Sequence, residues 1–340
     1  MHSLFSRLMV ATASIAMALA TPVYALNGDT LDRKGLTQTF GDDLNTFSWY
    51  AEGDVRKVGG GTWRTNYGYT WVPVNDVKNH TLVWNNEEQI YVDPGFTGSK
   101  TKALGLTAFS IKNGALQITA NKTRNTGLYG YKYTSGLITT EPTFTQTYGV
   151  FEMRAKLPKG KGFWPAFWML PADKTWPPEI DVMELLGNET TKYYTTLHWK
   201  LNDVQGKSNI PAHSIPDASA AFHIYGVEWT STEIIFYFNN KEVGRRPTPA
   251  DMHKPFYMLA NLAVGGGWPG SPDVTTKFPA VMEIDYIRAY KRDTVQPAAT
   301  ITSQPPVSKV PAPKPTSTST PKPVTKVITI KGAPTSVVRQ

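Results

Sequence analysis

Residues 150–157 read Val-Phe-Glu-Met-Arg-Ala-Lys-Leu, and from position 151 apolar and charged side chains alternate strictly. Positions 151, 153, 155 and 157 are apolar, and positions 152, 154 and 156 are charged. Successive side chains on a strand point to opposite faces, so a period of two sorts these residues onto two faces. The stretch therefore predicts a β-strand with one buried face and one solvent-facing face.

Less regular stretches of the same kind recur along the chain, separated by Gly, Pro, Asn and Asp. Residues 233–238 and 241–243 flank Asn239-Asn240, which predicts a hairpin with a tight turn. We find neither a helical period of useful length nor an internal repeat, which argues against a propeller or solenoid. The sequence predicts an all-β sandwich or jelly roll of two antiparallel sheets. The further candidate strands are residues 115–120, 222–230, 258–264 and 282–290.

The composition supports this fold class and excludes several kinds of site. The 340 residues include 27 Gly, 26 Pro and 10 Trp and are only 18% charged, which suits an all-β protein better than a helical bundle. With 0 Cys, the sequence excludes a disulfide framework, a thiolate metal site and a Cys nucleophile. The length is sufficient for one large domain or two small ones with a sizeable core.

Residues 2–25 have the organisation of a secretory signal. Arg7 precedes an apolar stretch over 8–20, and small residues occupy positions −3 and −1 of a cleavage site after Ala25. The apolar stretch is too short to span a membrane, and no other stretch approaches the roughly 18 apolar residues that a span requires. We therefore expect a signal peptide over 1–25 and a protein secreted to the extracellular space or the periplasm.

Residues 293–340 differ in composition from the rest of the chain. Pro, Ser, Thr and Lys dominate this segment, which predicts a disordered tail. Six Lys or Arg against Asp293 place +5 of the formal +8 there, and Arg7 adds another +1, so residues 26–292 keep +2. Those residues are expected to form a single nearly neutral domain. Without clustered cations on it, we expect no nucleic-acid partner.

Residues 176–187 read Trp-Pro-Pro-Glu-Ile-Asp-Val-Met-Glu-Leu-Leu-Gly and carry three carboxylates within six positions. On a regular strand Glu179 and Asp181 share a face, but Glu184 would point into the hydrophobic layer. An unpaired carboxylate in that layer carries a heavy desolvation cost. One extra residue in the strand, a β-bulge near Met183, returns the third acid to the face of the other two. Parity alone therefore predicts the bulge.

Three acids on one face repel one another, a cost that a purely structural strand avoids. Two carboxyls about 5–5.5 Å apart suit a retaining glycosidase, one as nucleophile and the other as acid and then base. The third acid would hydrogen-bond to the nucleophile and help to separate the proton affinities. On spacing alone a solvated acidic strand or a divalent cation site stays open, because hard cations also prefer clustered oxygens.

Residues 163–170 predict an aromatic face beside these acids. Trp164 and Trp168 share one face of the strand with position 166, and positions 163, 167 and 169 share the other. The second set is Phe, Phe and Met and is expected in the core. The two tryptophans are therefore expected to face a cleft, where flat rings suit sugar rings.

The sequence from Glu179 to Glu184 resembles the signature of glycoside hydrolase family 16, in the bulged form found in laminarinases, agarases and related bacterial endoglycanases. Residues 148–154, 162–171, 197–199 and 261–270 look like family blocks in family order, so the resemblance covers most of 40–292. It implies a concanavalin-type β-jelly-roll sandwich with a cleft on the concave sheet. The chain departs from the unbulged form typical of strict mixed-linkage lichenases and plant xyloglucan transglycosylases.

Matched position by position, the resemblance implies catalytic roles for the three acids. Glu179 would be the nucleophile, Asp181 the assisting carboxylate and Glu184 the general acid/base. Trp168 would lie near the reacting sugar and Trp164 further along the cleft.

Five further residues match substrate-binding positions of the family. Trp268 matches a stacking tryptophan in a Gly-rich loop, and Asn261 a sugar ligand. His198 resembles the histidine near the acid/base, with a structural histidine as the alternative. Glu152 and Arg154 match a polar pair beside the active carboxylates, with an ordinary cross-strand ion pair as the alternative.

The remaining expectations concern outer subsites and a metal ion. Asp285 matches an aspartate that many relatives use for a structural Ca²⁺, helped by a carbonyl near Gly114. No cofactor is expected for catalysis. Residues 49, 63, 71 and 84 are Trp in a region where the resemblance is weaker, and the sequence does not sort which of them line outer subsites.

Together these features predict a secreted, monomeric, retaining endo-β-glycanase acting on a polysaccharide. The family default is a β-1,3-glucan or a mixed β-1,3-1,4-glucan. Residues 176–187 and 248–255 look closest to bacterial endoglycanases that trim the producer's own exopolysaccharide, and both substrates stay open. The alternatives are a non-catalytic lectin-like sandwich, a transglycosylase, and a sulfated-galactan hydrolase, which a charge of +2 disfavours.

Overall fold

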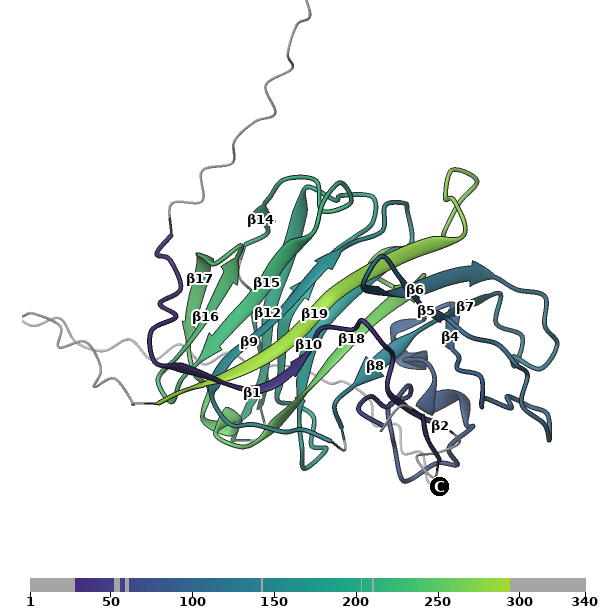
Figure 1. The fold of residues 1–340 in the computed structure, drawn as a ribbon, viewed down its shortest axis with the longest axis horizontal. Helices are drawn as coiled ribbons and strands as arrows, with labels where there is room; N and C mark the ends of the chain where they lie inside the picture. The colour runs from purple at the N-terminus through teal and green to yellow at the C-terminus, as the bar shows by residue number, and fades with distance from the viewer. Residues whose placement is uncertain are drawn as a thin grey trace, which may run out of the picture. The chain divides into compact units, whose positions relative to one another are not determined.

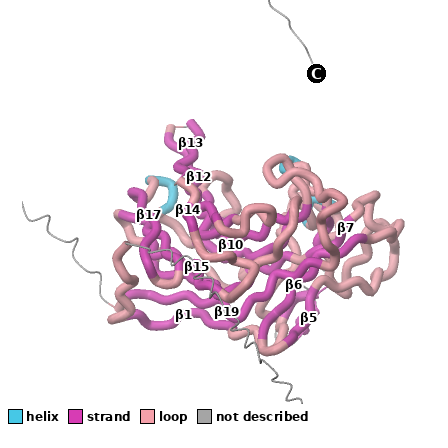
Figure 2. The backbone as a smooth tube through the Cα atoms, turned by 90° about the horizontal axis from the view of Figure 1, so that it is seen from above, coloured by secondary structure: helices cyan, strands magenta, loops and turns pink. Residues whose placement is uncertain are grey.

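The computed structural model describes residues 28–51, 56–58, 61–141, 143–202, 204–209 and 211–293. The expected signal peptide over 1–25, and the expected tail beyond Asp293, lie outside the described residues. Within these ranges two β-sheets lie one on the other, as the edge-on view in Figure 2 shows. The sandwich of two sheets predicted from the alternating pattern is therefore confirmed.

The larger sheet, called here the ten-stranded sheet, has the order β17-β16-β15-β9-β19-β6-β7-β4. β1 pairs with β19, along which it lies in Figure 1, and β5 pairs with β6. Its strands are β1 Leu36–Asp42, β4 Gln89–Tyr91, β5 Phe109–Lys112, β6 Ala115–Lys122, β7 Tyr133–Ser135, β9 Gly149–Lys156, β15 His223–Trp229, β16 Glu233–Phe238, β17 Lys241–Pro247 and β19 Ala280–Arg292.

The smaller sheet, called here the seven-stranded sheet, has the order β13-β12-β11-β10-β18-β8, and β14 pairs with β12. Its strands are β8 Leu137–Thr139, β10 Phe163–Pro171, β11 Glu179–Glu184, β12 Lys192–Leu201, β13 Val204–Asn209, β14 His213–Ser214 and β18 Phe256–Val264. Both β10 and β11, the strands with the expected aromatic and acidic faces, lie in the middle of this sheet.

The helical content of the described residues is limited to short 3₁₀ turns. These are η1 Val77–Asn79, η2 Val83–Asn85 and η3 Ala250–Met252, and a separate two-stranded ribbon pairs β2 Trp49–Ala51 with β3 Arg56–Val58. No helix in the described part of the chain has the length and apolar character needed to cross a membrane.

The core between the sheets forms because each strand gives it every second side chain. Phe151 and Met153 of β9 are fully buried there, together with Phe163, Phe167 and Met169 of β10. Burying large apolar side chains contributes roughly 1.5–3 kcal/mol each. The face assigned to the core in each of these two strands is therefore confirmed.

The candidate strands are found close to their expected bounds. Asn239 and Asn240 have φ of 48° and 65° in the β16–β17 turn, the left-handed pair that a type I′ hairpin requires. The antiparallel expectation has one exception among the paired strands described, because β4 pairs with β7 in parallel.

Candidate active site

The β-bulge on β11 is present where parity predicted it. On the β10 side Phe167 lies opposite Met183 and Trp168 lies opposite Asp181, so Val182 has no partner of its own. On the β12 side the register shifts again between Asp181 and Glu184. One extra residue therefore separates the second acid from the third.

The bulge places two consecutive side chains in the core and the third acid in the cleft. Val182 and Met183 are both buried between the sheets, with exposed fractions of 1% and 0%. Glu184 is half-buried and lines the same cleft as Glu179 and Asp181. The fold thus avoids the cost of a lone carboxylate between the sheets.

The cleft lies on the seven-stranded sheet and has a volume of about 980 Å³, near the upper end for a small-ligand site. Its floor comes from β10, β11, β12 and β18, and its walls come from loops, the η2 turn and β13. All four exposed tryptophans among the 10 of the chain line it: Trp71, Trp84, Trp176 and Trp268. Exposed aromatic rings gathered in one hollow indicate a ligand with flat apolar faces.

The two tryptophans of β10 face the cleft as expected, but in different environments. The indole nitrogen of Trp164 donates a hydrogen bond to Glu184 at 3.1 Å, and its ring meets that of Trp268 edge-on at 5.5 Å. Trp168 is 7% exposed and donates a hydrogen bond to the amide oxygen of Asn261 at 2.8 Å. The amide nitrogen of Asn261 donates to the Tyr91 hydroxyl at 3.0 Å.

Asn261 lines the cleft, as expected of a sugar ligand, but both ends of its amide already have protein partners. In this arrangement it holds the Trp168 ring in place. The structure thus shows a positioning contact, and the sugar-ligand role of Asn261 stays a prediction, because the amide keeps a second N–H.

Burial and neighbouring charge set the proton affinity of Glu184. Burial first, and then the charge of Glu179, raise the pKa of Glu184 to about 7. Lys207 on β13 and the hydrogen bond from Trp164 act in the opposite direction on this pKa. Such a carboxyl is still protonated at near-neutral pH, as a general acid requires.

Glu179 and Asp181 form a strongly interacting pair. Burial, and then repulsion between carboxylates, raise the pKa of both groups well above the usual values. The indole nitrogen of Trp176 donates a hydrogen bond to Glu179 at 2.8 Å, and this bond and His198 favour the ionised form of Glu179. The pair therefore does not readily lose both protons, and the proton it keeps is shared between the two carboxyls.

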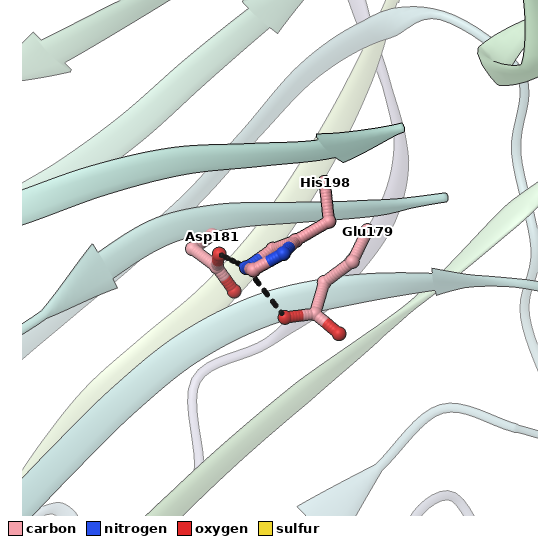
Figure 3. Close-up of side chains that lie close together, drawn as sticks. All are labelled: Glu179, Asp181 and His198. Atoms are coloured by element: carbon pink, nitrogen blue, oxygen red, sulfur yellow. Dashed lines mark ion pairs between the residues drawn. The ribbon is translucent and has the colours of Figure 1, made fainter. Parts of the chain in front are cut away.

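Figure 3 shows His198 between these two acids. Its Nε2 lies 3.6 Å from Glu179 Oε1 and 3.4 Å from Asp181 Oδ2, because β12 places His198 directly opposite Glu179. The resemblance had placed this histidine beside the acid/base. In the structure the acids within 4 Å of its Nε2 are Glu179 and Asp181.

The expectation that Glu152 and Arg154 lie beside the carboxylates is wrong. Both are on β9, in the ten-stranded sheet, and neither lines the cleft. Glu152 accepts a hydrogen bond from Arg33 at 2.5 Å, and Arg154 donates one to Asp285 at 2.6 Å. This expectation came from the family resemblance. The solvent-facing side predicted for β9 is also only partly confirmed, because Glu152 is 1% exposed. The ion-pair alternative is the correct description.

Asp285 has the position expected for a calcium ligand but a different partner. The register of β19 on β6, with Ile284 opposite Leu116, brings Asp285 near the β5–β6 turn that holds Gly114. However, the Asp285 carboxylate is paired with Arg154. The Ca²⁺ site expected from the resemblance therefore stays a prediction, because in the structure a guanidinium holds this carboxylate.

Comparison with known proteins identifies the family to which this chain belongs. The sequence pattern of "Glycosyl hydrolases family 16" matches residues 104–288. A beta-glucanase of Rhodothermus marinus is 33% identical over 254 residues, 67% of this chain and 84% of that protein. The chain belongs to glycoside hydrolase family 16. The sandwich is therefore the jelly roll expected of the family.

Another relative is an endo-1,3-1,4-beta-glycanase, ExsH, of Rhizobium meliloti (strain 1021), which is 42% identical over 268 residues and 78% of this chain. The chain spans about half the length of this relative, 54%. The laminarinase catalytic domain from Thermotoga maritima superposes with a TM-score of 0.60 at 32% identity, covering 76% of this chain and 99% of that chain.

Several cleft residues of this family 16 chain were missed by sequence reasoning. Trp176 precedes the acids in the sequence, but nothing in the local pattern shows that its indole nitrogen donates a hydrogen bond to Glu179. Lys207 lies at the cleft because β13 pairs with β12, and Tyr194 lies there because β12 pairs with β11. Neither pairing can be read from the local sequence. Trp71 and Trp84 line the cleft, whereas Trp49 and Trp63 are in the core.

Proposed function

We propose that this protein is a retaining endo-β-glucanase that hydrolyses β-1,3-linked or mixed β-1,3-1,4-linked glucan or a related bacterial exopolysaccharide. The observation that carries the proposal is the bulge, which brings Glu184 to the face of Glu179 and Asp181 in a tryptophan-lined cleft. Relatives named as endo-1,3-1,4-beta-glycanase and beta-glucanase support the substrate class.

In the first step Glu179 attacks the anomeric carbon of the sugar at the cleavage point. Trp176 holds one oxygen of this carboxylate by a hydrogen bond, which fixes its orientation for the attack. Glu184 donates its proton to the departing glycosidic oxygen, which a carboxyl with a pKa raised to about 7 by burial and by Glu179 can do. The products are a covalent glycosyl-enzyme and a shortened chain.

In the second step Glu184, now ionised, removes a proton from water, and the hydroxide attacks the same carbon. The bond to Glu179 breaks, and the sugar leaves with its original anomeric configuration. Asp181 accepts or returns the proton shared with Glu179 as that carboxylate becomes neutral and then charged again. Two carboxyls and one water complete the chemistry, so no step needs a cofactor.

The tryptophans support a neutral polymer as substrate. Trp268 and Trp164 line one part of the cleft, and Trp71 and Trp84 come from an N-terminal segment that precedes the matched family pattern. Rings in these positions suit stacking against several successive sugar units. The linkage and the choice between glucan and exopolysaccharide are part of this proposal.

Export and assembly belong to the same proposal. The basic start and apolar stretch of residues 2–25 support secretion to the extracellular space or the periplasm. We propose in addition that the enzyme acts as a monomer.

A structural Ca²⁺ at Asp285 and Gly114 stays a prediction from the family resemblance. Calcium would have to displace the Arg154 guanidinium from the Asp285 carboxylate. Thermal unfolding in Ca²⁺ and in a chelator tests it. A higher Tm in Ca²⁺ that is lost in Asp285→Asn would support the site, and equal Tm values would remove it.

The decisive experiment compares Glu179→Ala and the unmodified enzyme on a panel of β-glucans and bacterial exopolysaccharides. The variant should release no reducing sugar, yet should still bind the polysaccharide, because the tryptophans remain. ¹H NMR of early products should show the β-anomer. Normal depolymerisation by the variant would contradict the assignment, and binding without turnover by the unmodified protein would favour the lectin alternative. Extension of added oligosaccharide acceptors would favour a transglycosylase.

A further inference from the structure

Three side chains on the floor of the cleft have the arrangement of an incomplete metal site. His198 Nε2, Asp181 Oδ2 and Glu179 Oε1 lie within 4.8 Å of one another. Two of the separations are 3.4 Å and 3.6 Å, both measured from the imidazole nitrogen. Figure 3 shows the three groups converging from two adjacent strands.

These separations match tetrahedral coordination. With metal–ligand bonds of about 2.0–2.1 Å, two ligands of a tetrahedral zinc ion lie roughly 3.3–3.4 Å apart. The imidazole is therefore already at nearly the required spacing from both carboxylates. The backbone fixes this spacing, because Glu179 and His198 are direct partners across β11 and β12.

The ligand atoms also have unused bonding capacity. Asp181 is 3% exposed, and its Oδ2 is buried with no hydrogen-bond partner among the described residues. Trp176 binds Oε2 of Glu179, so the other oxygen, Oε1, faces His198. A buried oxygen without a donor is costly, and a cation placed between these atoms would satisfy it.

The donor set selects the class of ion. One imidazole nitrogen with two carboxylate oxygens suits Zn²⁺ and its neighbours among the divalent transition metals. Ca²⁺ and Mg²⁺ prefer oxygen-only sets, which this triad does not offer. A fourth position would face the cleft, where a water molecule would complete the coordination.

We propose that the cleft of this enzyme binds one divalent transition-metal ion on Glu179, Asp181 and His198, and that the bound ion competes with the polysaccharide. The ion would occupy the oxygen with which Glu179 attacks, so its effect is inhibitory. Binding of the ion is independent of the proposed hydrolysis, and only its inhibitory effect rests on that function.

Calorimetric titration of the chelator-treated full chain with ZnCl₂ tests the site. We expect saturable binding of one ion per chain, and no such binding with CaCl₂ or MgCl₂. His198→Gln and Asp181→Asn should each lose the binding, and His253→Gln, which alters an exposed histidine outside the cleft, should keep it. Absence of saturable zinc binding, or binding unchanged in both cleft variants, would overturn the proposal.

A second arm separates this site from the proposed function. Glu184→Gln leaves the three ligands intact and removes the general acid, so oligosaccharides stay uncleaved during the measurement. A laminari-oligosaccharide should weaken zinc binding to this variant in proportion to its concentration. If the oligosaccharide binds and the affinity for zinc is unchanged, the proposed competition is wrong. If the unmodified enzyme fails to hydrolyse glucan, the proposed function is wrong, but the zinc titration still tests the metal site.

Discussion

Two buried carboxylates, one in each sheet, differ in the partners that the fold gives them. Glu152 on β9 is 1% exposed and is bound by the Arg33 guanidinium and, at 3.3 Å, by the Tyr290 hydroxyl. Asp181 on β11 is 3% exposed, has two further acids as neighbours, and keeps one oxygen without a hydrogen-bond donor. The two carboxylates are thus buried to a similar extent, but Glu152 lies beside a positive charge and Asp181 lies beside two other acids.

The difference indicates which acids serve the structure and which serve the chemistry. A buried carboxylate with its own guanidinium is neutralised and links two parts of the chain. A cluster of buried carboxylates without one is held together at a cost in stability, and such clusters are typical of functional sites. The same distinction assigns Arg154 and Asp285, which pair with each other, to the structural group.

The largest expected contrast is in activity. Glu184→Gln should lower kcat on glucan by roughly 10²–10⁴-fold, because a general acid contributes on that order. Glu152→Gln makes the same chemical change in the ten-stranded sheet and should leave kcat within about twofold. Initial rates of reducing-sugar release measure both. A comparable loss in the two variants would show that the comparison of the sheets is wrong.

The next contrast is in the free energy of unfolding, where Glu152→Gln should have the larger effect and Glu184→Gln the smaller one. Glu152→Gln removes charge-assisted hydrogen bonds at a buried site and should lower the free energy of unfolding by about 2 kcal/mol. Glu184→Gln removes one of three mutually repelling acids and should leave this free energy unchanged or raise it. Urea denaturation in metal-free buffer measures both. A clearly destabilised Glu184→Gln would contradict the idea that the cluster is held at a cost.

A smaller effect concerns substrate binding. Trp268 is 42% exposed in the cleft, against Trp164 and Tyr194, and Trp268→Ala should raise KM about tenfold through lost stacking of about 1.4 kcal/mol. Tyr129→Ala, which removes an aromatic ring of similar exposure outside the cleft, is the control. Steady-state kinetics on a soluble glucan separates KM from kcat, and an unchanged KM would remove Trp268 from the substrate site.

The smallest expected effect is on the pH profile. Burial and Glu179 raise the pKa of Glu184 to about 7, so kcat/KM should fall as pH rises through that value and the acid loses its proton. Lys207 lowers this pKa, so Lys207→Met should move the alkaline limb to higher pH. Trp164→Phe should move it in the same direction, because it removes a hydrogen bond to the ionised form. A shift toward lower pH in either variant would contradict this assignment.

The parts of the site that the sequence could predict depend on faces of single strands. The bulge followed from the cost of placing Glu184 between the sheets, and the orientation of Trp164 and Trp168 followed from alternation in β10. Glu152 was placed beside the carboxylates by the family resemblance, and alternation could not correct this because it carries no information on the sheet to which a strand belongs. Lys207 and Trp176 were missed because strand pairing and loop conformation bring them to the acids.

The exposure of the tryptophans has a practical consequence for binding studies. The four most exposed indoles all line the cleft, and the remaining ones are shielded to a greater extent. A collisional quencher such as acrylamide will therefore quench mainly the fluorescence of the tryptophans in the cleft. Any ligand seated there should protect the protein's intrinsic fluorescence from quenching, so an unlabelled chain can report its own occupancy.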